Sequence, residues 1–120
     1  MKPLTEAEEG RVLVSYLRVK GYKFTHIANE TGSGRGAMMQ GRRNKQQGVS
    51  KGFPDYLIIA NNHVLAIELK RTKDSHTTPE QKSWIEALNT VGIPAKVCKG
   101  AEAAIQFIKE CVIQEDLEGL

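Results

Sequence analysis

The spacing of apolar residues in the first third of the chain predicts a helix followed by a short strand. Leu13 and Leu17 are four residues apart and therefore share one face of a helix, which Gly21 ends. Residues 22–26 then alternate between apolar and polar side chains, as a short strand does. Residues 29–36 are too rich in glycine to be regular.

The middle of the chain predicts two strands that pair with each other. Residues 56–60 and 63–67 are β-prone runs joined by Asn61-Asn62, and asparagine tolerates the positive φ that a two-residue turn requires. Both runs are apolar on both faces, which indicates central strands covered on two sides. A short helix is expected over residues 37–47, followed by an irregular stretch over residues 48–54.

The last third predicts a helix, a strand and a final helix. Thr78 is a suitable N-cap, and Pro79 is favoured at the first helical position. Residues 94–98 read as a strand. The final helix should turn these residues inward: Ala104, Ile105, Ile108 and Val112. The order of elements predicts one α/β domain over residues 1–120, with a mixed central sheet and helices on both sides.

The composition is that of a soluble globular protein, and we expect a cytoplasmic location. No apolar run is long enough to cross a bilayer, and the first residues lack the apolar stretch of a signal peptide. Cys98 and Cys111 lie in apolar surroundings without metal-ligand spacing. Buried free thiols in a reducing compartment explain them better than a disulfide does.

Charge is unevenly distributed along the chain. From Thr31 to Pro54 there is no acidic residue. The same stretch contains these cations: Arg35, Arg42, Arg43, Lys45 and Lys51. Such a segment suits a polyanionic partner, because each neutralised phosphate releases counterions. A solvated surface loop would have the same composition, so charge alone leaves both interpretations open.

Pairing the two middle strands outward from the Asn61-Asn62 turn brings three charged residues together. In this register Asp55 opposes Glu68, and Lys70 lies on the same face as Glu68. Like charges opposed on a sheet are destabilising, and a divalent cation such as Mg²⁺ or Mn²⁺ would offset that cost. The alternative is a turn aspartate beside an ordinary Glu68–Lys70 ion pair.

The motifs around these residues resemble a known nuclease family. They are the run Gly48 to Asp55, then Ile67-Glu68-Leu69-Lys70, then Thr78-Pro79-Glu80-Gln81. This set is similar to the virus-type replication–repair nuclease (VRR-NUC) family of the PD-(D/E)XK superfamily, from roughly Glu6 to Val112. The resemblance implies a restriction-endonuclease-like core and metal-dependent hydrolysis of DNA phosphodiester bonds. It also implies an acid on the first helix and a glutamine after the Glu-x-Lys strand.

Glu6, Glu8 and Glu9 are candidates for the first-helix acid, and Glu9 is our choice. Glu8 follows Thr5 by three residues, so a capping box already accounts for it. Glu9 lies four residues before Leu13, on the face that packs against the sheet. The alternative is a partly exposed carboxylate that the helix dipole favours.

Gln81 is the glutamine that the resemblance implies. It precedes Trp84 and Ile85 by three and four residues, so it faces the sheet. Thr78-x-x-Gln81 is also a capping box, and one side chain could both cap and reach the site.

Taken together, the resemblance implies a stand-alone endonuclease. Its expected catalytic residues are Glu9, Asp55, Glu68, Lys70 and Gln81. The metal is expected on Asp55, Glu68 and the Leu69 carbonyl, with DNA along residues 35–51. Small members of the family imply a homodimer acting on branched DNA such as a four-way junction, in a bacterial or phage-infected cell, with no membrane and no small organic cofactor. The alternatives are a nicking or repair endonuclease without junction preference, and a catalytically silent DNA-binding module.

Overall fold

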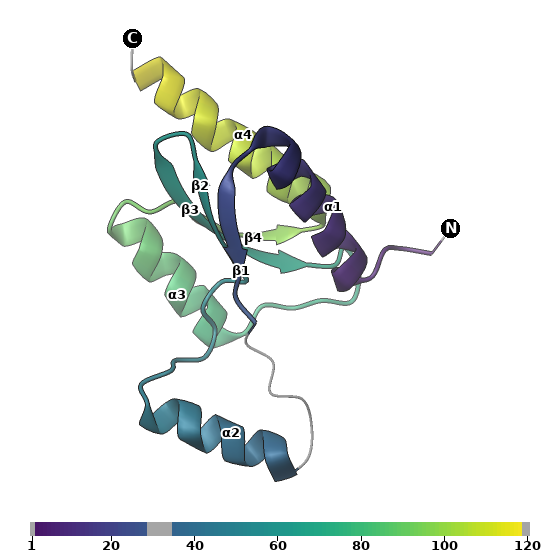
Figure 1. Cartoon of the computed structure of the whole chain (residues 1–120), viewed down its shortest axis with the longest axis vertical. Coiled ribbons are helices and arrows are strands. Elements are labelled where there is room, and N and C mark those ends of the chain that lie inside the picture. Colours follow the sequence, from purple (N-terminus) through teal and green to yellow (C-terminus); the bar gives the residue numbers. More distant parts are fainter. Residues whose placement is uncertain (1, 29–34, 119–120) are drawn as a thin grey trace.

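A computed structural model of the chain describes residues 2–28 and 35–118. In chain order the elements are α1 (Glu6–Lys20), β1 (Lys23–His26), α2 (Arg35–Gln46), β2 (Tyr56–Ala60), β3 (His63–Lys70), α3 (Pro79–Thr90), β4 (Ala95–Lys99) and α4 (Ala101–Glu118). They form an α/β domain in which helices flank a mixed four-stranded sheet, as the sequence predicts (Figure 1). Among the described residues, none of the helices is long and apolar enough to cross a membrane.

The sheet has the order β1-β2-β3-β4, so β2 and β3 are its central strands. Strands β1, β2 and β3 are antiparallel, and β4 pairs with β3 in parallel. The predicted register around the asparagine turn is confirmed: Ala60 opposes His63, Ile58 opposes Leu65, and Asn61 has φ 55°. This register places the start of β2 beside the end of β3.

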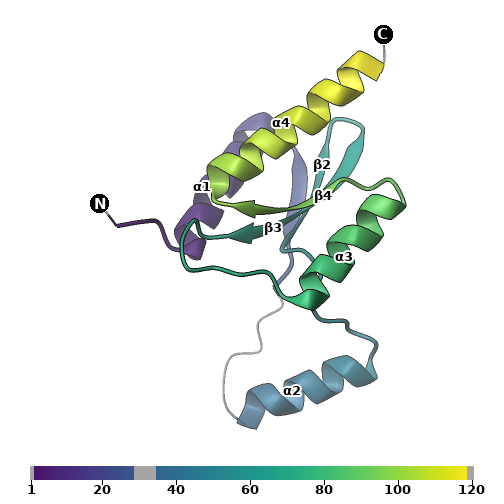
Figure 2. The same cartoon turned by 180° about the vertical axis from the view of Figure 1, so that it is seen from behind.

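Two helices, α1 and α4, pack against each other and cover one face of the sheet (Figures 1 and 2). The core between them and the sheet is built from fully buried side chains: Leu13, Leu17, Ile58, Leu65, Ile67 and Ile108. The inward face predicted for the final helix is confirmed, since Ala104 and Ile108 are buried and Ile105 and Val112 pack against the core. This hydrophobic layer fixes β2 and β3 in place.

The opposite face is covered by α3, but only in part. α3 packs against β4, and its Asn89 amide exchanges two hydrogen bonds with the backbone of Ala95, at 2.9 and 3.0 Å. At the hairpin end, Ile59 and Val64 are 45% and 42% exposed. The prediction that both strands are covered on both faces is therefore wrong at this end, because α3 is held over β4 instead.

Several element boundaries differ from the sequence-based expectation. β3 extends past residue 67 to Lys70, and α2 includes Arg35 and Gly36, which the glycine-rich stretch predicts to be irregular. The first strand begins at Lys23, because the Tyr22 N–H donates to the Leu17 carbonyl as part of the turn that ends α1. The last strand begins at Ala95, after a proline that has no N–H to donate. The short helix expected over residues 37–47 is present as Arg35–Gln46.

Candidate active site

Asp55 and Glu68 meet where β2 begins and β3 ends. Tyr56 pairs with Ile67, so the next opposed pair is Asp55 and Glu68. The Leu69 N–H donates to Asp55 Oδ2 at 2.9 Å, which holds the aspartate against the end of β3. The predicted opposition of the two carboxyl groups is therefore present in the structure.

Two further predicted residues converge on a single oxygen of Glu68. Lys70 Nζ lies 3.2 Å from Glu68 Oε2. Gln81 Nε2 donates to the same oxygen at 3.2 Å, reaching it from α3. The Glu68 side chain is almost fully buried, and that of Lys70 is 13% exposed. The cluster therefore lies on the α3 side of the sheet and opens to solvent beside Lys70.

The two carboxyl groups cannot both carry a full charge at little cost. Burial raises the pKa of Glu68 to about 8, and the neighbouring Asp55 carboxylate adds to the rise against the opposing effect of Lys70. Burial also raises the pKa of Asp55. Two hydrogen bonds lower this pKa in part, one donated by protonated Glu68 and one by the Leu69 N–H. Glu68 is therefore the carboxyl that holds the proton when no cation is present.

This donor set fits a hard divalent cation. Carboxylate oxygens are the ligands that Mg²⁺ and Mn²⁺ prefer, and a cation between Asp55 and Glu68 would stabilise their charged forms. Burial disfavours those forms and so raises both pKa values. In residues 2–28 and 35–118 no group of three or more His, Cys, Asp or Glu side chains could hold a metal. The remaining ligands would have to be a backbone oxygen, such as the Leu69 carbonyl, and water, which Mg²⁺ retains readily.

The start of α3 is positioned by two local devices. The Thr78 capping box is confirmed: the Gln81 N–H donates to Thr78 Oγ1, and Gln81 Oε1 accepts from the Thr78 N–H at 2.9 Å. Because its Nε2 atom donates to Glu68, the Gln81 amide both caps the helix and reaches the site. The sequence left these two roles open, and the structure combines them.

The second device is Gly52, three residues before Asp55. It has φ +89°, and a Cβ placed on it would lie 2.6 Å from the Glu80 carbonyl carbon and 2.7 Å from the Gln81 nitrogen. Only glycine lets this segment pack directly on the first turn of α3. Gly52 thereby joins the segment that carries Asp55 to the helix that carries Gln81. Phe53 strengthens the contact, with its ring edge-on to Trp84 and 5.0 Å between centroids.

Glu9 is buried where α1 meets the start of α4. The predicted capping box of Thr5 and Glu8 is present, and Glu9 is buried with 6% exposure, on the face expected for it. Its Oε1 atom accepts the Ala101 N–H at 3.1 Å, at the start of α4. A carboxylate is favoured there by the helix dipole. Glu9 therefore caps α4.

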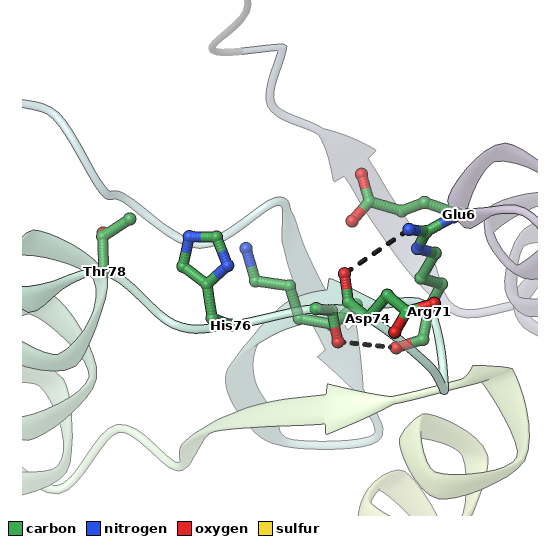
Figure 3. Close-up of a pocket in the computed structure, with 7 residues that line it drawn as sticks. Glu6, Arg71, Asp74, His76 and Thr78 are labelled. Atoms are coloured by element: carbon green, nitrogen blue, oxygen red, sulfur yellow. Dashed lines mark hydrogen bonds between the residues drawn. The ribbon is translucent and has the colours of Figure 1, made fainter.

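A different first-helix carboxylate borders the site. A cavity of about 400 Å³ beside Lys70 is lined by Glu6 from α1 and by the β3–α3 loop (Figure 3). The loop residues that line it are Arg71, Asp74, Ser75, His76 and Thr78. Arg71 shapes this loop, since its guanidinium donates to the Asp74 carbonyl at 3.4 Å and its own carbonyl accepts from Ser75 Oγ at 2.8 Å.

Of the residues that line this cavity, the sequence predicts Lys70 as catalytic and offers Glu6 as a candidate for the first-helix acid. The remaining lining residues are not predicted, because residues 71–77 read only as a connecting loop. The position of this loop was the available signal. Residues that directly follow the Glu-x-Lys strand lie next to Lys70, and therefore beside the site. Glu6 lies seven residues before Leu13, so helix periodicity places the two on one face, and this signal could have favoured Glu6.

The predicted DNA-binding cations lie outside the carboxylate cluster. Arg42, Arg43 and Lys45 are exposed on α2, and Lys51 is exposed just before Gly52. Arg35 begins α2, but its side chain lies outside what the structure describes. Figures 1 and 2 show α2 set apart from the sheet and its covering helices.

The fold agrees with comparisons to known proteins. The family model described as VRR-NUC domain matches residues 16–102. A solved structure described as "VRR_NUC domain protein" is 31% identical, with a TM-score of 0.73 and coverage of 92% of this chain and 89% of that chain. Another, described as "VRR_NUC domain", has the same fold at 15% identity, with a TM-score of 0.60 and coverage of 88% of this chain and 97% of that chain. No curated protein matches the sequence. The matched range is narrower than the resemblance seen in the motifs, and it leaves out Glu6, Glu8 and Glu9.

Proposed function

Because the chain belongs to the VRR-NUC family of PD-(D/E)XK nucleases, we propose that it is a Mg²⁺- or Mn²⁺-dependent endodeoxyribonuclease whose centre is Asp55, Glu68 and Lys70. The observation that carries this proposal is the contact between two carboxyl groups of raised pKa, with Lys70 3.2 Å from one of them. A buried pair of this kind costs stability unless a cation is bound. Perturbed carboxyl groups beside a cavity are typical of catalytic sites.

Each residue of the cluster has a distinct proposed role. Asp55 and Glu68 hold the cation, together with the Leu69 carbonyl. When bound, the cation supplies a nucleophilic water and neutralises charge on the scissile phosphate. The Leu69 N–H fixes the orientation of the Asp55 carboxylate through the 2.9 Å hydrogen bond to Oδ2.

Lys70 and Gln81 act on the phosphate side of the cluster. The Lys70 ammonium is directed to Glu68 Oε2 and is close enough to stabilise negative charge that develops on a phosphate oxygen. The Gln81 amide donates to the same Glu68 oxygen and is held by its capping contacts, so it can orient a water or phosphate without moving.

Glu9 is proposed as the first-helix acid. It is the buried carboxylate of α1, and its Oε1 hydrogen bond to the Ala101 N–H fixes its orientation. Glu6 is a second candidate for this role, because it lines the cavity beside Lys70.

The proposed substrate is branched DNA, bound by a homodimer. One chain carries one cluster, so a symmetric cut of two strands requires two copies. The exposed cations Arg42, Arg43, Lys45 and Lys51, together with Arg35 at the start of α2, are proposed to bind the phosphate backbone.

The test is a cleavage assay across duplex, nicked, flap, splayed and four-way DNA, with Mg²⁺, with Mn²⁺ and with chelator. We expect metal-dependent cleavage that is fastest on the four-way substrate. Equal rates on all substrates would favour an endonuclease without junction preference. Binding without cleavage in both metals would contradict the catalytic proposal and indicate a silent DNA-binding module.

A further inference from the structure

The part of helix α2 whose side chains the structure describes, residues 39–43, 45 and 46, buries none of them. Every side chain of α2 whose exposure is described is exposed, including Met39 at 49%. Among the described elements, the close packing of helices against the sheet involves α1, α3 and α4 (Figures 1 and 2). Over these described side chains, α2 therefore lacks the buried apolar face that stabilises most protein helices.

The sequence of α2 is also a poor helix former. The element has 12 residues and includes Gly36 and Gly41. Isolated helices shorter than roughly 12–15 residues are marginal in water even when they are rich in alanine, and each interior glycine costs about 0.8–1 kcal/mol relative to alanine. A chain of this composition needs an external partner to remain helical.

The chemistry of α2 identifies that partner as an anion. Met39, Arg42, Arg43 and Gln46 follow one another at helical spacing, so they form one exposed face. Residues 31–54 contain no acid that could balance these cations. A second copy of α2 would present the same charge and be repelled. The DNA backbone matches both the sign of the charge and the need for an extended surface.

We propose that α2 is a DNA-docking helix that becomes fully formed only when it lies against the phosphate backbone, away from the cleavage centre. The inference rests on the proposed DNA substrate and goes beyond it, because it couples binding to the folding of one element. Part of the binding free energy is then used to order α2. A substitution that stabilises α2 in the free protein should therefore tighten DNA binding without adding a contact to DNA, because less binding free energy is then used to order the helix.

Gly41 provides the test. A Cβ at this position would have no neighbour within 4 Å, and helical spacing places it on the side of α2 away from Met39 and Arg43. Gly41→Ala should therefore tighten binding of a short DNA duplex, measured in the presence of chelator. The affinity should rise by up to about four- to fivefold, which corresponds to the difference in helix propensity between alanine and glycine. Gly41→Pro should weaken it at least tenfold. Ser15→Ala, at an exposed position of α1, is the matched control and should leave DNA affinity unchanged.

Two readouts accompany the affinities. Far-ultraviolet circular dichroism, corrected for the DNA, should show helix gained on binding by the unmodified protein and less gained by Gly41→Ala. Unchanged affinity for Gly41→Ala, or no gain of helix on binding, would overturn the proposal. So would a change in dimerisation with no change in DNA affinity, because the partner would then be a second copy. All binding is measured without metal, so failure of the proposed function would show separately, as an unmodified protein that does not bind or does not cleave DNA.

Discussion

Gly52→Ala should damage the site from a position that contacts no substrate. Gly52 has φ +89° and packs on the backbone of Glu80 and Gln81, with a Cβ position 2.6–2.8 Å from three of their atoms. A methyl group there has to push the first turn of α3 away by roughly half an ångström to one ångström before ordinary contact is restored. Gln81 would move with it, away from Glu68.

The expected loss of stability in Gly52→Ala has two parts, which a matched variant separates. Holding a non-glycine residue at positive φ costs about 1–2 kcal/mol. Overpacking against a backbone adds about 1–3 kcal/mol. Gly48 has φ +86° but no atom within 4 Å of its Cβ position, so Gly48→Ala carries only the first part. We expect Gly52→Ala to destabilise the protein by about 2–5 kcal/mol in total. We expect turnover to fall about 10- to 100-fold, since a displacement of about 1 Å can cost a factor of this size.

The measurements are urea unfolding and single-turnover cleavage at saturating DNA, with Gly48→Ala, Gly52→Ala and the unmodified protein compared in the same buffer. Gly48→Ala should lose about 1–2 kcal/mol and retain its turnover. Equal stability and equal turnover for the two variants would refute the argument that Gly52 couples the Asp55 segment to α3.

Three further predictions follow from the charges. Without metal, the free energy of unfolding should fall by on the order of a few kcal/mol as the pH rises from 4.5, the ordinary pKa of a glutamate, to about 8, because Glu68 keeps its proton over that range only in the folded protein. Glu68→Gln cannot titrate, so its free energy of unfolding, measured in urea, should depend less on pH. Replacing Arg42 and Arg43 together by alanine should weaken duplex binding and reduce its salt slope by up to about two, leaving metal affinity unchanged; an unchanged slope would mean that these cations are only solvated. Glu9→Gln should lower both stability and turnover, because the Ala101 N–H loses a charged acceptor and the site loses its proposed acid. Glu8→Gln can still accept the Thr5 N–H and cap α1, so it should change little. An inactive Glu8→Gln beside an active Glu9→Gln would contradict the choice of Glu9.

The central geometry could be predicted because it depends on local rules. A two-residue turn at Asn61-Asn62 fixes the register of β2 and β3, and that register opposes Asp55 and Glu68. The capping box of Thr78 and Gln81 is likewise written in four consecutive residues. Interactions between residues close in sequence therefore determine the local positions of four site residues: Asp55, Glu68, Lys70 and Gln81.

The remaining features depend on packing between distant segments, which a local pattern does not specify. Glu9 was correctly placed on the buried face of α1, but its acceptance of the Ala101 N–H depends on where α4 begins. Gly52 packs directly on the first turn of α3, a close approach between segments that lie far apart in the sequence. The position of α2 apart from the sheet could not be predicted either, because the charge of this segment does not specify what it packs against.

Glu68→Gln tests the central claim most directly, because it removes one charge while keeping the size of the side chain and groups able to meet Lys70 and Gln81. Cleavage of a four-way junction in Mg²⁺ and thermal unfolding without metal would be measured on the same preparations. The account predicts that cleavage is lost, while the unfolding temperature at pH 8 is unchanged or slightly raised, because the repulsion between Asp55 and Glu68 is relieved. Near-normal Mg²⁺-dependent cleavage by Glu68→Gln would contradict it.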